Sequence, residues 1–166
     1  ENGLQAPNRA HNLRFYFKQG VQVHDRSQTD EPLLLGMGLA AYGRGDQQQT
    51  IQYAQPTHQD NEVSYQHPQL REWYRNSSKG LEQGFDLPTR PFAAEAELWL
   101  DIQLQGEVKA QQNGADIQLQ TQSGRTLSFA QLHADDATGK RLPSRMVVLD
   151  ESRLRLWIDD RQAVYP

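Results

Sequence analysis

The sequence contains no cysteine and no long apolar run. Without cysteine there can be no disulfide bond and no metal site built on thiolates. A membrane-spanning helix needs about 18 consecutive apolar residues, and the mean hydropathy of −0.83 agrees with the lack of such a run. We therefore expect no membrane insertion. At 166 residues the chain is long enough to bury a core without a covalent staple.

An excess of basic residues is also missing. The sequence has 17 Lys and Arg against 21 Asp and Glu, a net charge of −4, and an isoelectric point of about 5.7. Binding to nucleic acid needs a basic face for the phosphates, whereas the Lys and Arg here are scattered among acids. We expect no nucleic-acid partner.

Familiar catalytic motifs are absent as well. The sequence holds no G-x-S-x-G, H-E-x-x-H, P-loop or Cys–His arrangement. Paired acids occur, and a glycosidase would need two carboxyl groups facing each other across a cleft. The candidate pairs are Asp135 with Asp136, Asp150 with Glu151, and Asp159 with Asp160. All lie in or beside expected turns, where aspartate hydrogen-bonds the turn backbone, so we favour a structural role over catalysis.

Helical spacing of apolar residues is lacking along the whole sequence. Only residues 67–73 could form a helical turn. Apolar residues instead alternate with polar ones, most clearly over residues 98–105, and turn signals recur every 8–12 residues. The sequence therefore predicts an all-β fold, a mostly antiparallel β-sandwich of about a dozen short strands with little or no helix.

The alternation begins after a polar stretch that contains Pro7. We expect residues 1–10 to be an N-terminal arm and residues 11–166 to be one β-sandwich-like domain. Residues 11–18 and 21–24 form the first expected hairpin. Another short strand is expected to begin at Ile51 and Tyr53.

Glycines mark three special positions in the expected strands and turns. Gly36 and Gly38 fall on one face of a strand, which indicates a bulge or the close approach of another backbone. Asn113 followed by Gly114 predicts a hairpin with a type I′ turn, in which both residues have positive φ.

Residues 70–88, LREWYRNSSKGLEQGFDLP, form the most distinctive predicted hairpin. Trp73 and Tyr74 lie on its first strand, the turn ends near Gly80, and Phe85 lies on the returning strand. Since Trp73 and Tyr74 point to opposite faces, one of them must lie inward. We predict that this hairpin is a stability element in which Trp73 and Phe85 are the main apolar groups.

WYRN, a short turn and GLEQGF together resemble a signature of N-terminal modules of bacterial secreted proteins. Those proteins continue into FG-GAP, integrin-like β-propeller or similar repeats. Similar stretches are NRAHNLRFYF at 8–17, LAAYGR at 39–44, residues 132–143, and LWIDDRQAVYP at 156–166. The resemblance implies a β-rich module of a secreted or cell-surface bacterial protein whose chain continues beyond Pro166. It brings no assigned chemistry. A polar start at Glu1 would suit either a mature N-terminus after export or an artificial boundary.

Two groups of residues are candidates for a metal site. His58, Asp60 and Glu62 alternate along one extended segment, but a single strand rarely supplies a complete site. Asp135, Asp136 and Thr138 could offer oxygen ligands to Ca²⁺, although the EF-hand spacing is missing. We expect no metal and no cofactor, with calcium at the second group as the alternative.

The tryptophans are the candidate interaction residues. Trp99 and Trp157 fall on the phase opposite the apolar residues of their strands, so a one-sided sheet would expose them. With Tyr165, near the expected junction, they could stack on sugar rings or dock against another domain. The alternative is that both faces of their strands are covered.

Three functions follow as hypotheses. The first is a non-catalytic structural and interaction module that caps or presents repeat domains of the same chain or contacts other subunits. The second is a carbohydrate-binding or adhesive module that uses the outward aromatic residues. The third is a hydrolase that uses one of the acidic pairs.

Overall fold

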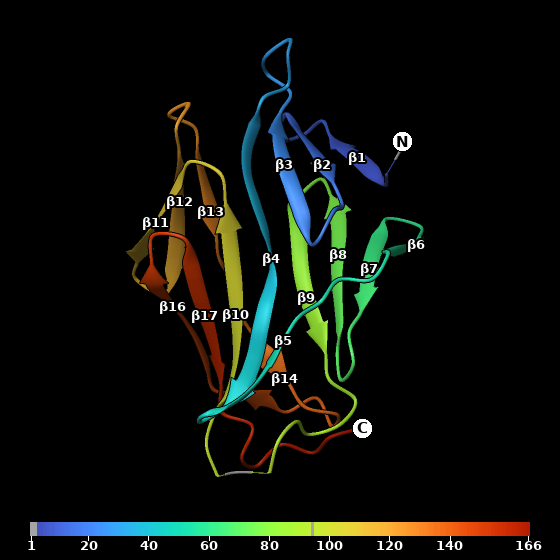
Figure 1. Ribbon diagram of the computed structural model, residues 1–166, viewed down its shortest axis with the longest axis vertical. Helices are drawn as coiled ribbons and strands as arrows, with labels where there is room; N and C mark the ends of the chain where they lie inside the picture. The colour runs from blue at the N-terminus through green and yellow to red at the C-terminus, as the bar shows by residue number, and fades with distance from the viewer. Residues whose placement is uncertain (1–2, 94) are drawn as a thin grey trace.

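A computed structural model describes residues 3–93 and 95–166 (Figure 1). None of these residues is helical, and every strand pair among them is antiparallel. The chain is an all-β sandwich, as its alternating pattern predicts. Over the same residues there is no helix with the length and hydropathy needed to cross a membrane. Glu1, the possible mature N-terminus, lies outside the described residues.

The first layer is one large sheet with the strand order β1-β2-β3-β4-β10-β17-β16, and β5 pairs with one end of β4. Its strands are β1 (Gln5–Asn8), β2 (Leu13–Tyr16), β3 (Val21–Asp25), β4 (Leu33–Arg44), β5 (Gln47–Thr50), β10 (Leu98–Gln105), β16 (Ser144–Asp150) and β17 (Arg153–Ile158).

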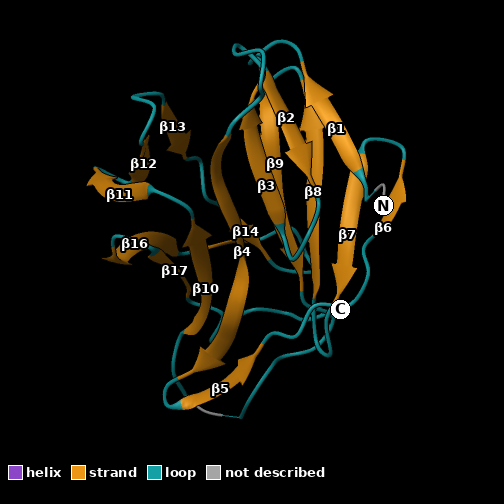
Figure 2. Cartoon of the chain, turned by 45° about the horizontal axis from the view of Figure 1, so that its top comes forward, coloured by secondary structure: helices purple, strands orange, loops and turns teal. Residues whose placement is uncertain are grey.

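Two smaller sheets and a two-stranded ribbon complete the sandwich. The four-stranded sheet has the order β6-β7-β8-β9 and the three-stranded sheet the order β11-β12-β13. Figures 1 and 2 show the four-stranded sheet beside β1–β3 and the three-stranded sheet near β16 and β17. The strands are β6 (Thr57–Gln59), β7 (Glu62–Gln66), β8 (Arg71–Ser77), β9 (Gly80–Asp86), β11 (Val108–Asn113), β12 (Asp116–Thr121), β13 (Thr126–Phe129), β14 (Ala134–Asp135) and β15 (Arg141–Leu142).

Strand β4 is the longest strand and changes partner along one edge. The edge pairs with β3 up to Met37 and with β5 from Ala41 onward, while β10 runs along the other edge. An irregularity in the β4–β10 register leaves Ala40 without a direct partner, because Ile102 pairs with Leu39 and Asp101 pairs with Ala41. This bulge shifts the phase of β4.

One continuous core lies between the layers. It contains the apolar residues of β2–β4, β10 and β17, together with those of β7, β8 and β12. Ring contacts such as Phe17 with Tyr74, at 5.9 Å between centroids, join the large sheet to the four-stranded sheet. The alternation that predicted the strands also identifies most of this core.

The expectation of an arm over residues 1–10 is wrong for Gln5–Asn8, which form β1 and pair with β2. Tertiary hydrogen bonds fix this strand, since the side-chain amide of Asn8 donates to Asn76 Oδ1 at 2.8 Å and to the Ser77 carbonyl at 2.7 Å. Such long-range bonds leave no local sequence signal.

Two local predictions also need correction. The strand expected to begin at Ile51 and Tyr53 lies earlier in the chain. It is β5, which ends at Thr50, so Ile51 and Tyr53 are outside it. In the 113–114 hairpin, Gly114 has φ of +62° but Asn113 is not among the positive-φ residues. Asn113 pairs with Asp116, so the turn residues are Gly114 and Ala115. Positive φ at the first turn position alone is typical of a type II′ turn and excludes type I′.

Candidate functional site

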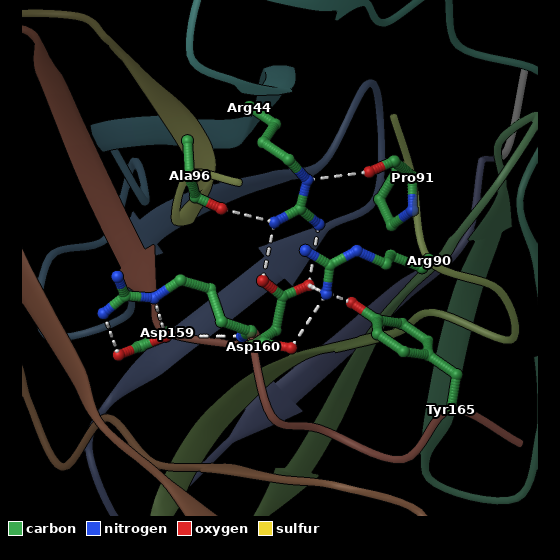
Figure 3. Close-up of polar contacts among 8 residues, drawn as sticks. Arg44, Arg90, Pro91, Ala96, Asp159, Asp160 and Tyr165 are labelled. Atoms are coloured by element: carbon green, nitrogen blue, oxygen red, sulfur yellow. Dashed lines mark hydrogen bonds and ion pairs between the residues drawn. The ribbon is translucent and has the colours of Figure 1, made fainter. Parts of the chain in front are cut away.

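A buried ion pair joins Arg44, the last residue of β4, to Asp160, two residues beyond β17 (Figure 3). We call this end of the sandwich its base. The pair is bidentate, with Nη1 donating to Oδ1 and Nη2 to Oδ2, each at 2.7 Å. Arg44 is 0% exposed and Asp160 1% exposed. Two further guanidinium hydrogens donate to the carbonyl groups of Pro91 at 3.0 Å and Ala96 at 2.6 Å. These hydrogen bonds, together with the paired charge, make an arginine acceptable in the interior.

The sheet register explains why Arg44 points inward. It pairs with Leu98 of β10, and Tyr42 pairs with Leu100, so both share the core face after the bulge at Ala40. Asp160 lies two residues after the end of β17, and the Asp159 amide between them donates to the Pro143 carbonyl at 2.9 Å. The pair therefore joins the end of β4 to the segment after β17, 116 residues away along the chain.

Asp160 also binds the C-terminal segment and the loop before β10. The Tyr165 hydroxyl donates to Asp160 Oδ2, and the Arg90 guanidinium donates to the Asp160 carbonyl at 2.9 Å. Burial alone would raise the pKa of Asp160, but the hydrogen bonds from Arg44 and Tyr165 and the nearby positive charges outweigh it and lower the pKa. Burial, followed by the contact with Asp160, raises the pKa of Tyr165.

Asp136 provides a second anchor for the same segment. Its Oδ2 accepts the Val164 amide at 3.0 Å, and the Ala137 amide donates to the Val164 carbonyl at 2.9 Å. Oδ1 accepts the amides of Thr138 and Lys140 at 2.9 and 3.0 Å. These hydrogen bonds, that from the Thr138 hydroxyl first, lower the pKa of Asp136 to about 2.

The three acidic pairs hold turns and segments in place. Asp150 accepts the backbone and hydroxyl of Ser152, as expected for a turn aspartate. Asp159 pairs with Arg161, which lowers its pKa to about 2, whereas its neighbour Asp160 is buried against Arg44. Sequence reasoning missed this buried role, since Arg44 and Asp160 are distant in the chain.

Neither metal candidate gathers a set of ligands. His58 is exposed on β6, Asp60 lies in a turn at φ +54°, and Glu62 pairs with Arg71 and Arg75. Asp136 Oδ1, in the second group, already accepts hydrogen bonds from Thr138 and Lys140. Over residues 3–93 and 95–166, no three His, Cys, Asp or Glu side chains come together as a metal site.

A second buried polar centre surrounds Glu72, a residue that the sequence analysis did not single out. Glu72 is 0% exposed and accepts hydrogen bonds from Tyr74, from the Leu39 amide at 3.2 Å and from Tyr53 at 2.9 Å. His67 Nε2 lies 2.8 Å from its other side. The signal in the sequence is a glutamate on the inward phase, between Leu70 and Tyr74.

The Glu72 centre fills the gap where β4 changes partner. Leu39 lies between the part of β4 that pairs with β3 and the part that pairs with β5. Its amide donates to Glu72, and its carbonyl lies 2.9 Å from the Tyr53 hydroxyl, whose single hydrogen also faces Glu72. Burial, followed by the charge of Glu72, raises the pKa values of Tyr53 and Tyr74. The centre therefore satisfies backbone groups that a sheet would otherwise leave unpaired.

The candidate interaction residue Trp99 is buried, at 4% exposed, so it cannot offer its ring to a partner. It lies over Gly43, its cross-strand partner, and Arg155 covers it at 4.2 Å from the ring centroid. The outer face of this central strand is thus covered, as the alternative interpretation holds.

Trp157 and Tyr165 are only half-buried. Two guanidinium groups, those of Arg145 and Arg155, each lie 5.2 Å from the Trp157 ring centroid. Arg145 in turn pairs with Glu97 at 3.2 Å. Trp157 is therefore partly accessible, and its ring lies against two guanidinium groups.

The hairpin predicted around Trp73 is present as β8 and β9, closed by Gly80 at φ +126°. Tyr74 is its inward aromatic residue, 0% exposed, and Trp73 is the outward one. The choice of Trp73 as a main apolar group is therefore wrong. Phe85 is half-buried and packs against the core.

No protein-family model, no curated protein and no solved structure matches this chain.

Proposed function

We propose that this chain is a non-catalytic structural and interaction module of a secreted or cell-surface bacterial protein, which presents the repeat domains that follow it. The observation that supports this proposal is the fixation of residues 159–165 to the base of the sandwich. Asp160 is held by Arg44, and Val164 by Asp136. The segment is thus bound through both side chains and backbone.

Such an anchor would restrict the orientation of a following domain relative to the sandwich. A flexible linker lets two domains move independently, whereas a segment held up to Tyr165 transmits the orientation of the sandwich to its neighbour. The hydrogen bond between Tyr165 and Asp160 extends this rigidity to the penultimate residue described. The bacterial, secreted context comes from the resemblance of the sequence and is part of the proposal.

Glycan binding through outward aromatic residues is the second candidate. The half-exposed Trp157 favours it, while the burial of Trp99 removes one of the two platforms. The third candidate, a hydrolase, gains no support from the acidic pairs, since Asp136, Asp150 and Asp160 are held by backbone, hydroxyl or guanidinium groups.

The experiment compares rigidity in the full-length protein. Spin labels on the sandwich and on the next domain report the distribution of distances between them. We expect a narrow distribution that broadens in Asp136→Asn/Tyr165→Phe, which loosens the anchor. Asp150→Asn is the matched control, because Asp150 holds a comparable turn elsewhere.

A wild-type distribution as broad as that of the loosened variant would overturn the proposal. A glycan array tests the second candidate function, carbohydrate binding. Specific binding that is lost in Trp157→Ala, with an unchanged melting temperature, would favour carbohydrate recognition over presentation.

A further inference from the structure

Strand β9 forms one edge of the four-stranded sheet. It is seven residues long and contains neither proline nor lysine, its charged residues are Glu82 and Asp86, and β8 is its one neighbour in the sheet. Edge strands with free backbone groups pair readily with other strands, so proteins usually shorten, charge or cover them. The other long edges of the described residues show such protection.

Strand β16 illustrates a covered edge. The side-chain amide of Gln112 donates to the Met146 carbonyl and accepts from the Val148 amide, both at 3.2 Å. It thereby takes the place of a neighbouring peptide group. The Ala110 amide of β11 donates to the Glu151 carbonyl at 3.2 Å, which closes the same edge further along. At the opposite end of the large sheet, β1 has four residues and includes Pro7.

The direction of the free groups on β9 follows from the β8–β9 register. The Asn76 amide of β8 donates to the Asn61 carbonyl, on the side away from β9. Asn76 pairs with Leu81, so this is a pair without mutual hydrogen bonds, and the amide and carbonyl of Leu81 point away from β8. By alternation, those of Gln83 and Phe85 point the same way.

These outward groups have no partner among residues 3–93 and 95–166. None of the hydrogen bonds found outside the strand ladders involves the backbone of Leu81, Gln83 or Phe85. The three side chains face the core side, where Leu81 and Phe85 pack as half-buried apolar groups. The edge therefore offers free backbone amides and carbonyls beside the apolar side chains of Leu81 and Phe85.

We propose that β9 pairs antiparallel with β9 of a second copy of this chain, with Gln83 opposite Gln83. In this register Leu81 lies opposite Phe85 of the other copy, and each of the three outward residues exchanges both backbone bonds with its opposite residue. A two-fold axis through Gln83 makes the contact self-complementary and closed. The half-buried Leu81 and Phe85 cover each other as a cross-strand apolar pair.

The charged residues of β9 agree with this register. Glu82 lies opposite Gly84 of the other copy, and Asp86 lies opposite Gly80, so no two carboxylates are directly opposed. Like charges in opposed positions would destabilise the pair. Within each copy, Arg75 pairs with Glu82 at 3.3 Å and Arg71 with Asp86 at 3.0 Å, which reduces the acidic charge of the edge.

The first measurement is sedimentation of the wild-type protein over a range of concentrations, combined with amide hydrogen exchange. We expect a shift from one chain mass to two as concentration rises. The amides of Leu81, Gln83 and Phe85 should then exchange more slowly, while those of Glu82 and Gly84, already bonded to β8, should not change.

Two substitutions of Gln83 test whether the outward backbone groups of β9 form the dimer. Gln83→Pro removes an outward amide and should abolish the dimer, because proline cannot donate to an added strand. Gln83→Ala loses only the side-chain bond to the Tyr74 hydroxyl and should dimerise like the wild type.

A wild-type chain that stays monomeric at its highest soluble concentration would overturn the pairing and leave the edge to a strand of another protein. Dimerisation without slower exchange at Leu81, Gln83 and Phe85 would also overturn it. This exchange test remains decisive even if Gln83→Pro fails to fold.

Discussion

The side chain of Trp73 lies across Gly84, its cross-strand partner on β9. A Cβ atom on Gly84 would stand 2.0 Å from Trp73 Cζ2. Trp99 has the same relationship to Gly43, at 2.3 Å, and in both cases an arginine covers the indole, Arg75 at 4.8 Å and Arg155 at 4.2 Å. The second glycine of GLEQGF, Gly84, is thus explained by the space that an indole needs, an arrangement known to compensate for glycine in strands.

Replacing this glycine should destabilise the domain. Gly84→Ala places a methyl group inside the contact distance of Trp73, and overpacking of this kind costs about 1–3 kcal/mol. Denaturant unfolding measures the loss. Gly36→Ala is the matched control, because a Cβ at Gly36 would meet its nearest atom at 3.4 Å. Equal midpoints for the two variants would contradict the role given to Trp73.

The two aromatic residues of β8 should differ in their contribution to stability. Tyr74 is fully buried and donates to Glu72, so Tyr74→Ala should cost about 3–5 kcal/mol, as for other large buried aromatics. Trp73→Ala removes a half-exposed ring and should cost less, within the range of about 0.5–3 kcal/mol common for substitutions. Thermal melting of both variants ranks them, and the reverse order would show that the outward face matters more than the core.

The strands and most of the core could be predicted because alternation is a local property of the sequence. The buried polar centres could not, because their partners are set by the topology. Glu72 meets Leu39, 33 residues away, where β4 changes neighbour. The exposure of each tryptophan likewise depends on which residue lies opposite it on the neighbouring strand. The sequence of one strand does not reveal that cross-strand partner.

The stretches that carry the sequence resemblance meet in the fold. Asn8 of the first stretch contacts Asn76 of WYRN at 2.8 Å, and Arg44 of LAAYGR binds Asp160 of LWIDDRQAVYP. Their particular residues therefore serve tertiary contacts between segments. Regular alternation alone gives no reason to expect such contacts.

The anchor at Asp136 should open in acid. Its pKa is lowered from the usual 3.8 to about 2, chiefly by the Thr138 hydroxyl and the Val164 amide. A lowered pKa in the folded state means that the stabilisation is complete above about pH 5 and is lost as the pH falls through the unfolded value of 3.8 and then through about 2. The Val164 amide resonance, followed by NMR, should titrate with a midpoint near 2. Asp136→Asn should remove this titration, and a midpoint near 4 would contradict the hydrogen-bonded carboxylate.

The Arg44–Asp160 pair gives the sharpest test of the interior. Arg44→Met leaves Asp160 buried without its main partner, and breaking a buried ion pair in this way costs about 3–5 kcal/mol. Arg44→Lys keeps the charge but cannot form the two parallel bonds, so it should fall between methionine and the wild type. Urea unfolding at neutral pH measures all three proteins.

The double variant Arg44→Met/Asp160→Leu decides whether the unpaired charge is the cause of that loss. With both charges removed, the penalty for the isolated carboxylate disappears, and replacement of a buried pair by apolar residues is often close to neutral. Recovery should be incomplete, since the Pro91 and Ala96 carbonyls lose the donors that Arg44 supplies and an unsatisfied buried group costs about 1–3 kcal/mol. We expect the double variant to be more stable than Arg44→Met alone. If it is equally unstable or worse, the other contacts of the two residues, those of Arg44 with the Pro91 and Ala96 carbonyls and of Asp160 with the Tyr165 hydroxyl, hold this end of the sandwich together and the ion pair contributes little.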